Sequence, residues 1–502
     1  AADTRERFAQ YFNLAYAFYQ ASSYQAGQSH HARGFCSLNL SDLGRALELG
    51  LIDENEILLE LMGRPLSPVR LKNAPQSAPR PDQEPEHPAL ASAVRKAVDR
   101  IVEIESARGE MTTPVSHLAA SVCSCYGAKA FVDIVLRMEK DSYVRGYNFI
   151  GDDSTRKSML SHLLKCCRPG AEDDAQALRG LLKGKKIGDA RLVDAAMYAP
   201  QWMDIMEAYL GWNGLTSAAW YFHAHMNGFF TKEKRSIVAR YSSIEPEDFT
   251  EGAFDVEWFW DAYRTLGEER FQTVYQSAKY VATGNQHRRA QLFADAVTNR
   301  LDKADAEKAI LEKRNKDQLL AYALIPIADK RDTLRRYELI QAFLRQAKGF
   351  GAQRQAGEAT AGRIALANLA RNAGYADVNR LMWRMEPEKL AEVSHVFAPQ
   401  TVEGVALRVA VDASGMASLE VERDGKALKD VPASIKKHAL VVQMKAVQQE
   451  LKQQHARARA SLENAMVSED GFEPSELAEL RKHPVIAPLL THLVFVQGDR
   501  HG

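Results

Sequence analysis

Residues 303–347 read KADAEKAILEK-RN-KDQLLAYALIPIA-DK-RDTLRRYELIQAFLRQA, which is three helix-length segments separated by two short breaks. The segments cover 303–313, 316–328 and 331–347. Consecutive helices joined by short turns are typical of α-solenoids and related helical arrays, in which neighbouring helices bury one another's apolar faces. This stretch therefore predicts a mainly α-helical repeat fold.

Segments of the same length extend in both directions from this stretch, and short breaks with Gly or Pro separate many of them. Further helices are expected near 90–108, 115–139, 154–167, 172–183, 200–210, 215–228, 254–265, 268–282, 286–300, 358–372 and 376–385. The segments follow no strict consensus, and their period varies. An irregular HEAT-like array, α-solenoid-like in its organisation, therefore fits better than tetratricopeptide or ankyrin repeats.

Two further helices are predicted near the start of the chain. Asp3 with Glu6, and Asp53 with Glu56, are pairs that can cap a helix N-terminus, and Gly63 can end the second helix. Apolar residues of the first helix recur at spacings of three and four and are expected on one face: Phe8, Tyr11, Phe12, Ala15 and Tyr19.

Proline is concentrated between Gly63 and Pro88, where seven of the 18 prolines lie. Because proline fixes φ and lacks an N–H donor, this stretch is expected to be an extended linker without a regular helix. A proline-rich docking peptide is the alternative, although no clean P-x-x-P repeat occurs.

The helical pattern is interrupted after residue 400. Residues 405–411 (VALRVAV) and 417–423 (ASLEVER) alternate, and a turn with Gly415 separates them. We expect a small β-hairpin insertion near 404–431, with a third short strand near Leu428. A lone hairpin is barely stable in water, so it must pack against helices.

Helices return after 433 with a long apolar stripe: Met444, Val447, Leu451, Ala458, Leu462 and Ala465.

These changes in pattern divide the chain into five predicted parts. They are an N-terminal helical segment at 1–62, a Pro-rich linker at 63–88, a helical repeat domain at 89–400, a β-hairpin at 401–432, and the helical start of a C-terminal domain at 433–502. The last part is expected to be truncated.

Composition excludes several classes of protein. Lys and Arg together number 65, as do Asp and Glu, so the formal net charge is zero and no bulk positive field attracts nucleic acid. No apolar run is long enough to span a membrane. Five cysteines, an odd number, do not form a disulfide framework. Without a signal peptide at its start, the chain is expected to be cytoplasmic, and the missing initiator Met suggests processing or a fragment.

Aromatic residues are concentrated between 198 and 263. Five of the six tryptophans and 16 of the 42 aromatic residues lie there. Such a cluster can be a core between helices, a groove for a partner or ligand, or a catalytic pocket. The residues taken as candidates for partner binding are Trp202, Trp212, Trp220, His223 and His225.

The pair His223 and His225 suggests a metal site, but on a helix residues two apart point about 200° away from each other. One imidazole is therefore expected inside and the other at a surface or groove, with a distant third metal ligand as the alternative. Among other patterns, G-x-S-x-G, H-E-x-x-H, the Rossmann glycines and the P-loop are all missing from the sequence. No catalytic residue, metal ligand or cofactor is assigned.

Three runs resemble the large bacterial MolR-like proteins, named for a regulator of molybdate metabolism. They are AAMYAPQW at 195–202 with YLGW at 209–212 and AWYFHAH at 219–225; RDGK at 423–426 with LENAMV at 462–467; and HPVIAPL at 483–489 with LVF at 493–495. The resemblance covers roughly residues 90–495. It implies helical repeats followed by a C-terminal domain of unknown function that continues past residue 495. The Trp-Gly-Arg signature of the WGR module does not occur in the chain.

These observations predict a helical-repeat scaffold or adaptor that binds a macromolecular partner, most simply a protein. The first alternative is a regulatory protein that associates with nucleic acid, as the MolR-like resemblance implies. The second is an enzyme with an unrecognised site where the helical and C-terminal domains meet. The sequence does not say whether a small molecule binds.

Overall fold

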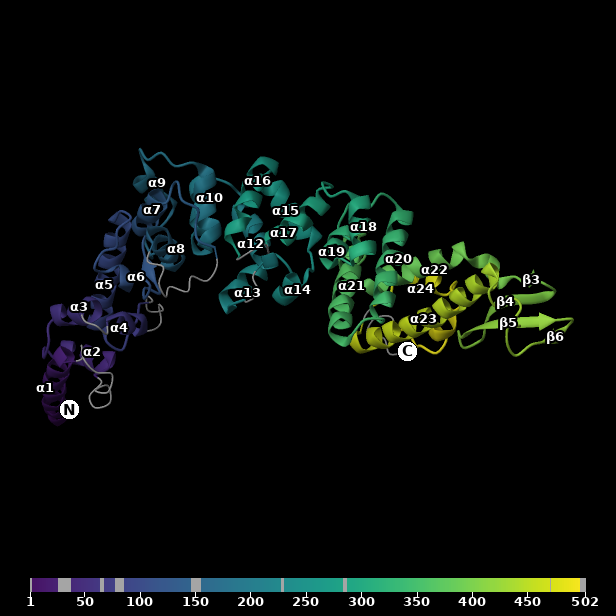
Figure 1. Ribbon diagram of the computed structural model, residues 1–502, viewed down its shortest axis with the longest axis horizontal. Helices are drawn as coiled ribbons and strands as arrows, with labels where there is room; N and C mark the ends of the chain where they lie inside the picture. The colour runs from purple at the N-terminus through teal and green to yellow at the C-terminus, as the bar shows by residue number, and fades with distance from the viewer. Residues whose placement is uncertain are drawn as a thin grey trace. The chain divides into compact units, whose positions relative to one another are not determined.

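The computed structural model is 65% helical, with 25 α-helices among the residues it describes and a small antiparallel sheet near the C-terminus (Figure 1). The predicted mainly α, repeat-like fold is therefore confirmed. The structure describes residues 2–25, 38–63, 67–76, 85–145, 155–226, 230–282, 287–469 and 471–496.

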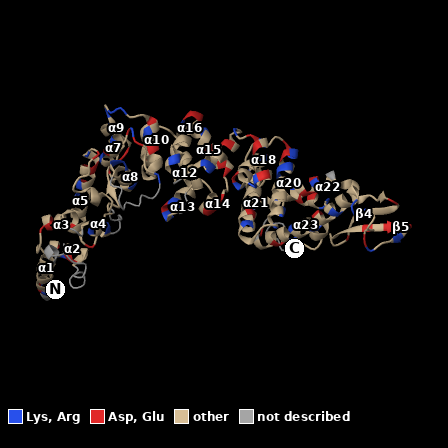
Figure 2. Ribbon diagram, in the orientation of Figure 1, with Lys and Arg blue, Asp and Glu red and all other residues tan. Residues whose placement is uncertain are grey.

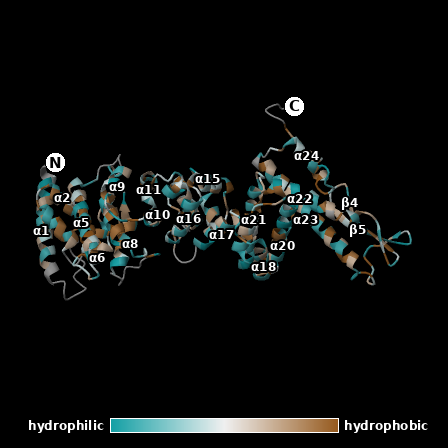
Figure 3. Cartoon of the chain, turned by 90° about the horizontal axis from the view of Figure 1, so that it is seen from above, coloured by the Kyte–Doolittle hydropathy of each residue, from teal (hydrophilic) through white to brown (hydrophobic). Residues whose placement is uncertain are grey.

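The chain divides into two compact units. The first comprises residues 1–246 and 257–291, and the second comprises 247–256 and 292–502. Each has a core of its own. In both units hydrophilic and hydrophobic residues alternate along most helices, as expected for helices that bury one face (Figure 3). No helix in the described ranges is both long enough and apolar enough to cross a membrane.

The first unit consists mainly of short helices, and several of them have a side-chain N-cap. Asp53 caps its helix through Glu56 N (3.0 Å) and Gly63 follows the last turn, as predicted. Its helices are α1 (Ala2–Gln25), α2 (Leu40–Glu48), α3 (Glu54–Met62), α4 (Ser67–Asn73), α5 (Pro88–Ala107), α6 (Ser116–Ala119), α7 (Ala128–Arg137), α8 (Arg156–Cys166), α9 (Ala175–Leu182), α10 (Asp189–Tyr198), α11 (Met203–Leu210), α12 (Leu215–Met226), α13 (Lys232–Val238), α15 (Val256–Leu266) and α16 (Glu268–Ser277).

Some predictions for the first unit are wrong. The single helix expected at 115–139 is instead the two helices α6 and α7, separated by a strand at 125–126. The helix α4 lies inside the proline-rich stretch, because Pro68 stands in its first turn, where a missing N–H costs no hydrogen bond. Tyr11 does not share the buried face of α1. It is 55% exposed while its neighbour Phe12 is 1% exposed, since adjacent helical residues point about 100° apart.

The first unit also contains a short parallel pair of strands that the sequence pattern did not predict. Strand β1 (Cys125–Tyr126) pairs with β2 (Cys167–Arg168), and Cys125 lies opposite Cys167. Both cysteines are buried and free. Two residues per strand are too few to show the alternation by which a strand is recognised in a sequence.

The second unit begins with α14 and includes residues 292–297 of α17. Its helices are α14 (Pro246–Glu251), α17 (His287–Val297), α18 (Lys303–Lys313), α19 (Lys316–Tyr322), α20 (Lys330–Ala347), α21 (Ala352–Asn372), α22 (Val378–Glu392), α23 (Ala439–Ser468), α24 (Pro474–Leu480) and α25 (Ala487–Leu490). Asp302, Asn315, Asp329 and Asp377 cap four of them through their side chains.

The predicted hairpin is present and is part of a four-stranded antiparallel sheet. Strand β4 (Val405–Val411) pairs along its whole length with β5 (Ala417–Arg423). The third strand is β6 (Lys426–Ala427), adjacent to the predicted Leu428, and the unpredicted β3 (Gln400–Val402) pairs with β4. The apolar face of the sheet packs on α23, where Val405, Leu407, Met444 and Leu451 share one core.

Candidate functional site

The five residues singled out by the sequence lie mostly in the core of the first unit. Trp202 is 0% exposed, Trp220 4%, His223 3% and His225 1%, whereas Trp212 is half-buried. A side chain that its own chain covers has no surface to offer a partner. The burial therefore fits the core interpretation for four of the five and leaves Trp212 accessible.

Trp202 shows how this core is built. It ends the 3-10 turn Pro200–Trp202, and its ring stacks on Phe131 of α7 with centroids 4.4 Å apart. Its indole Nε1 donates a hydrogen bond to the carbonyl oxygen of Cys167 (2.8 Å). The only polar atom of the side chain is thus satisfied, and the rest of the ring is buried against apolar neighbours.

The expectation that only one of the two histidines is buried is wrong. Every residue of α12 except Ser217 is buried, because this helix is surrounded by other helices of its unit. His223 has its pKa lowered to about 3, first by burial and then by the charge of Lys234, so it is neutral. In the ranges that the structure describes, no three His, Cys, Asp or Glu side chains gather closely enough to hold a metal ion.

Beside this core lies a cavity of ≈ 580 Å³, which we call the acidic cavity. It is bordered by α11, the turn 211–214, the first turn of α12 and the residue Tyr241. Its lining contains Asp204, Glu207, Thr216 and Ser217. The cavity therefore belongs to the aromatic segment, although sequence reasoning did not name its residues.

The turn between α11 and α12 gives this cavity its shape. Gly211 and Gly214 both have positive φ (65° and 87°), which glycine adopts without strain. A Cβ added to Gly214 would lie 3.0 Å from Thr265, so the close packing also requires glycine. The Glu207 carboxylate accepts hydrogen bonds from the backbone N–H groups of Gly214 (3.3 Å) and Thr216 (2.6 Å) and so caps the N-terminus of α12.

The groups in the acidic cavity are suited to a cation. Asp204 is exposed and has no hydrogen bond or ion pair among the described residues. The ring of Tyr241 stacks on Trp258 (5.5 Å, 5°), and burial, followed by the charges of Asp204 and Glu207, raises the pKa of its hydroxyl. Carboxylates and aromatic rings both attract ammonium and guanidinium groups.

A further polar group lines the acidic cavity. Thr216 lines the cavity and is 8% exposed, and its Oγ1 is buried without a hydrogen-bond partner in the described part of the chain. Buried hydroxyls rarely lack a partner. Two arginines lie nearby. Arg179 donates a hydrogen bond to the carbonyl oxygen of Ala208 (3.0 Å), and the charge of Arg240 offsets part of the rise in the pKa of Tyr241.

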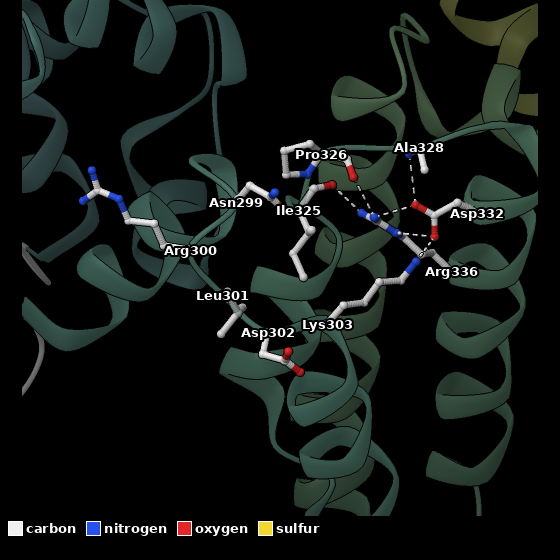
Figure 4. A pocket seen from close by; sticks show the side chains of 10 residues that line it. All are labelled: Asn299, Arg300, Leu301, Asp302, Lys303, Ile325, Pro326, Ala328, Asp332 and Arg336. Atoms are coloured by element: carbon white, nitrogen blue, oxygen red, sulfur yellow. Dashed lines mark hydrogen bonds and ion pairs between the residues drawn. The ribbon is translucent and has the colours of Figure 1, made fainter.

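The second unit contains a cavity of ≈ 410 Å³, whose polar groups, unlike those of the acidic cavity, are bonded to one another (Figure 4). Arg336 is 0% exposed and donates to Asp332 (2.6 Å) and to the carbonyl oxygens of Tyr322 (3.2 Å), Ile325 and Pro326 (3.0 Å). Lys303 also bonds Asp332. The guanidinium holds the turn between α19 and α20, and its N–H groups are used within the chain.

The junction of the helical and C-terminal parts contains a buried ionic network, which sequence reasoning missed. Glu386 of α22 is 2% exposed and accepts hydrogen bonds from Tyr337 Oη (2.7 Å), Arg457 Nη2 (2.7 Å) and the amide of Gln454. Its partners come from α20 and α23, so the network joins three helices. Because these partners are 49 to 71 residues from Glu386 in the chain, the sequence alone does not show which residues it bonds.

A second carboxylate extends this ionic network. Glu450 of α23 pairs with Arg457 (3.0 Å), Arg345 (3.2 Å) and Lys389 (3.2 Å). Burial alone would raise the pKa of Glu450, but the charges of Lys389 and Arg457 outweigh it and lower that pKa. Arrangements of this kind hold helices together as well as form active sites, so the network by itself does not indicate catalysis.

Comparison with known proteins gives two family matches. The family of unknown function DUF5724 matches residues 1–385, and the domain of unknown function DUF4132 matches residues 425–501. No curated protein matches the chain, and no solved structure does. The expected C-terminal domain of unknown function is thus found, whereas no match carries the MolR-like name. Because the first match covers well over half of the 502 residues, the chain belongs to the family of unknown function DUF5724.

Proposed function

We propose that the chain is a cytoplasmic helical scaffold, HEAT-like in its repeats and related to MolR-like proteins, that binds a protein partner through the acidic cavity. The observation that carries the proposal is the open carboxylate of Asp204 beside Glu207, the Tyr241 ring and the unsatisfied Thr216 hydroxyl. Together these groups suit a lysine or arginine side chain of the partner.

The charges around the acidic cavity favour a protein partner over nucleic acid. Phosphates are attracted by clustered Lys and Arg, whereas carboxylates repel them. In the view of Figure 2, Lys and Arg are interspersed with Asp and Glu along the described helices. Binding of nucleic acid would have to use another surface, and it would weaken steeply with salt.

Titration with N-acetyl-arginine amide, followed by tryptophan fluorescence, tests the proposal. The ring of Tyr241 is stacked on Trp258, so a cation in the acidic cavity will change the emission of that indole. We expect saturable binding of the arginine probe and none of its citrulline counterpart, which has the same shape without the charge. Asp204→Asn will weaken binding about fivefold, the value of one solvent-accessible carboxylate of about 1 kcal/mol.

Asp261→Asn is the matched control, because Asp261 is an exposed aspartate of α15 outside the acidic cavity. It will leave the affinity for the arginine probe unchanged. Equal binding of arginine and citrulline, or equal loss in both variants, would contradict the proposal. So would binding that Asp204→Asn does not alter.

A further inference from the structure

The first helix, α1, has two apolar faces, and only one of them is covered by the described residues. On the inner face Phe12, Ala15 and Tyr19 are 1%, 5% and 7% exposed. Hydrogen bonds from Tyr16 Oη to Glu56 (2.6 Å) and from Tyr19 Oη to Glu60 (3.0 Å) fix that face on α3. These contacts therefore hold α1 against α3 and leave its opposite face outward.

The outer face of α1 is a stripe of large exposed side chains. Tyr11 is 55% exposed, Leu14 76% and Phe18 54%. Arg7 and Ala21 extend the same line, so the spacing along the stripe is four, three, four and three residues. That alternation is the seam of a two-stranded coiled coil. Exposed apolar residues scattered singly need no explanation, but three on one seam mark a contact surface.

We propose that a second copy of this chain covers the stripe, with its α1 antiparallel to the first and the two Leu14 side chains facing each other. The inference is independent of the acidic cavity and of the partner proposed above. In this arrangement Arg7 of one copy lies near Ala21 of the other, since each is seven residues, or about 10 Å, from Leu14.

Charge favours the antiparallel direction. From Phe8 to Gln25 the helix has no charged residue, and its last turn has no basic residue to offset the negative end of the helix dipole. Antiparallel pairing brings the guanidinium of Arg7 to that end of the second copy. Parallel pairing would instead place Arg7 beside Arg7 at the positive ends of both helices.

Sedimentation velocity of the full chain over about 1–200 µM tests the dimer, because a seam of three large side chains gives a weak association. We expect a concentration-dependent shift from monomer to dimer. Leu14→Glu will abolish it, as two carboxylates would meet in the seam. Leu311→Glu, at a site 67% exposed on α18, is the matched control and will dimerise like the parent chain. A monomer at every concentration, or dimers that survive Leu14→Glu, would overturn the proposal.

Cysteine cross-linking tests the direction, in chains whose Cys36 and Cys123 are replaced by serine. We expect a mixture of the Arg7→Cys and Ala21→Cys chains to form a disulfide-linked dimer on oxidation. Neither variant will do so alone. Cross-linking of Ala21→Cys with itself, in chains that keep Arg7, would show parallel helices and would overturn the antiparallel arrangement. Equal cross-linking in the Leu14→Glu background would show random collision and would also overturn it.

Discussion

The surroundings of Trp202 in the first unit and of Glu386 in the second are equally buried, but different forces hold them. Trp202 stacks on Phe131 and uses a single hydrogen bond. Glu386 holds Tyr337 and Arg457 through directed, charge-assisted bonds. Apolar burial acts in every direction and scales with area, so an aromatic core tolerates some rearrangement. A buried ionic network is stable only when every member is present.

The largest effect is expected from Trp202→Ala, which empties a volume that the neighbours cannot fill. We expect the free energy of unfolding to fall by about 4 kcal/mol in urea titrations. Hydrogen exchange measured by mass spectrometry will show the loss in peptides of 189–226. Equal loss of protection in peptides of 439–465 would contradict the separation of the two cores.

Glu386→Gln tests the ionic core with little change of shape. The amide still meets Tyr337 and Gln454, but Arg457 loses the charge of its buried partner and keeps only the pair with the less buried Glu450. We expect a loss of about 2 kcal/mol in the free energy of unfolding, the value of a charge-assisted hydrogen bond. Glu388→Gln, two residues along the same helix, is the control. Its pair with Arg384 is long (3.8 Å) and accessible, so it will change stability by less than about 0.5 kcal/mol.

Acidification is expected to weaken both cores through one histidine in each. Burial lowers the pKa of His223 to about 3 and that of His483 to about 4. The unfolded chain takes up protons below about pH 6.5 while the folded chain does not, so stability falls as the pH drops from there towards the folded values. Each histidine contributes a slope of up to about 1.4 kcal/mol per pH unit.

Denaturant titrations at pH 7, 6 and 5 measure that slope. The amide of His223→Gln does not titrate, so this variant will lose the contribution of His223 to the slope of stability against pH, up to about 1.4 kcal/mol per pH unit. His492→Gln at an exposed position is the control. An unchanged slope in His223→Gln would show that this imidazole is protonated in the folded chain.

The smallest effect is expected from Trp212→Ala at the rim of the aromatic core. Trp212 is half-buried, and Arg270 lies over its ring at 5.3 Å, a contact worth less than about 1 kcal/mol. Thermal melting will therefore change little. A loss as large as that of Trp202→Ala would place Trp212 in the core and remove the distinction between core and rim.

The two cores also differ in how far the sequence predicts them. The tryptophans crowded between 198 and 263 allow a core as one of three interpretations, because large aromatic residues concentrate where helices pack and also at binding surfaces. The hairpin at 405–423 and the capping by Asp53 follow equally from local patterns. These features form between residues that are close in the sequence, so a local sequence pattern is enough to predict them.

The ionic network and the acidic cavity escape that kind of reasoning. Glu386 meets Arg457 across 71 residues of chain, and nothing near either residue marks the pairing. Glu207 becomes a helix cap only through the backbone of the turn with Gly211 and Gly214. The helical period places His223 and His225 on different faces of α12, but the local sequence does not record the helices that cover both faces.

The position of Glu386 constrains how the two matched regions can be recombined. It follows directly after the DUF5724 match at 1–385, while Gln454 and Arg457 lie within the DUF4132 match at 425–501. A foreign DUF5724 region would deprive Glu386 of its hydrogen bond from Tyr337, and a foreign DUF4132 region would deprive it of Gln454 and Arg457. Chimeras will therefore need matched replacements on both sides of Glu386.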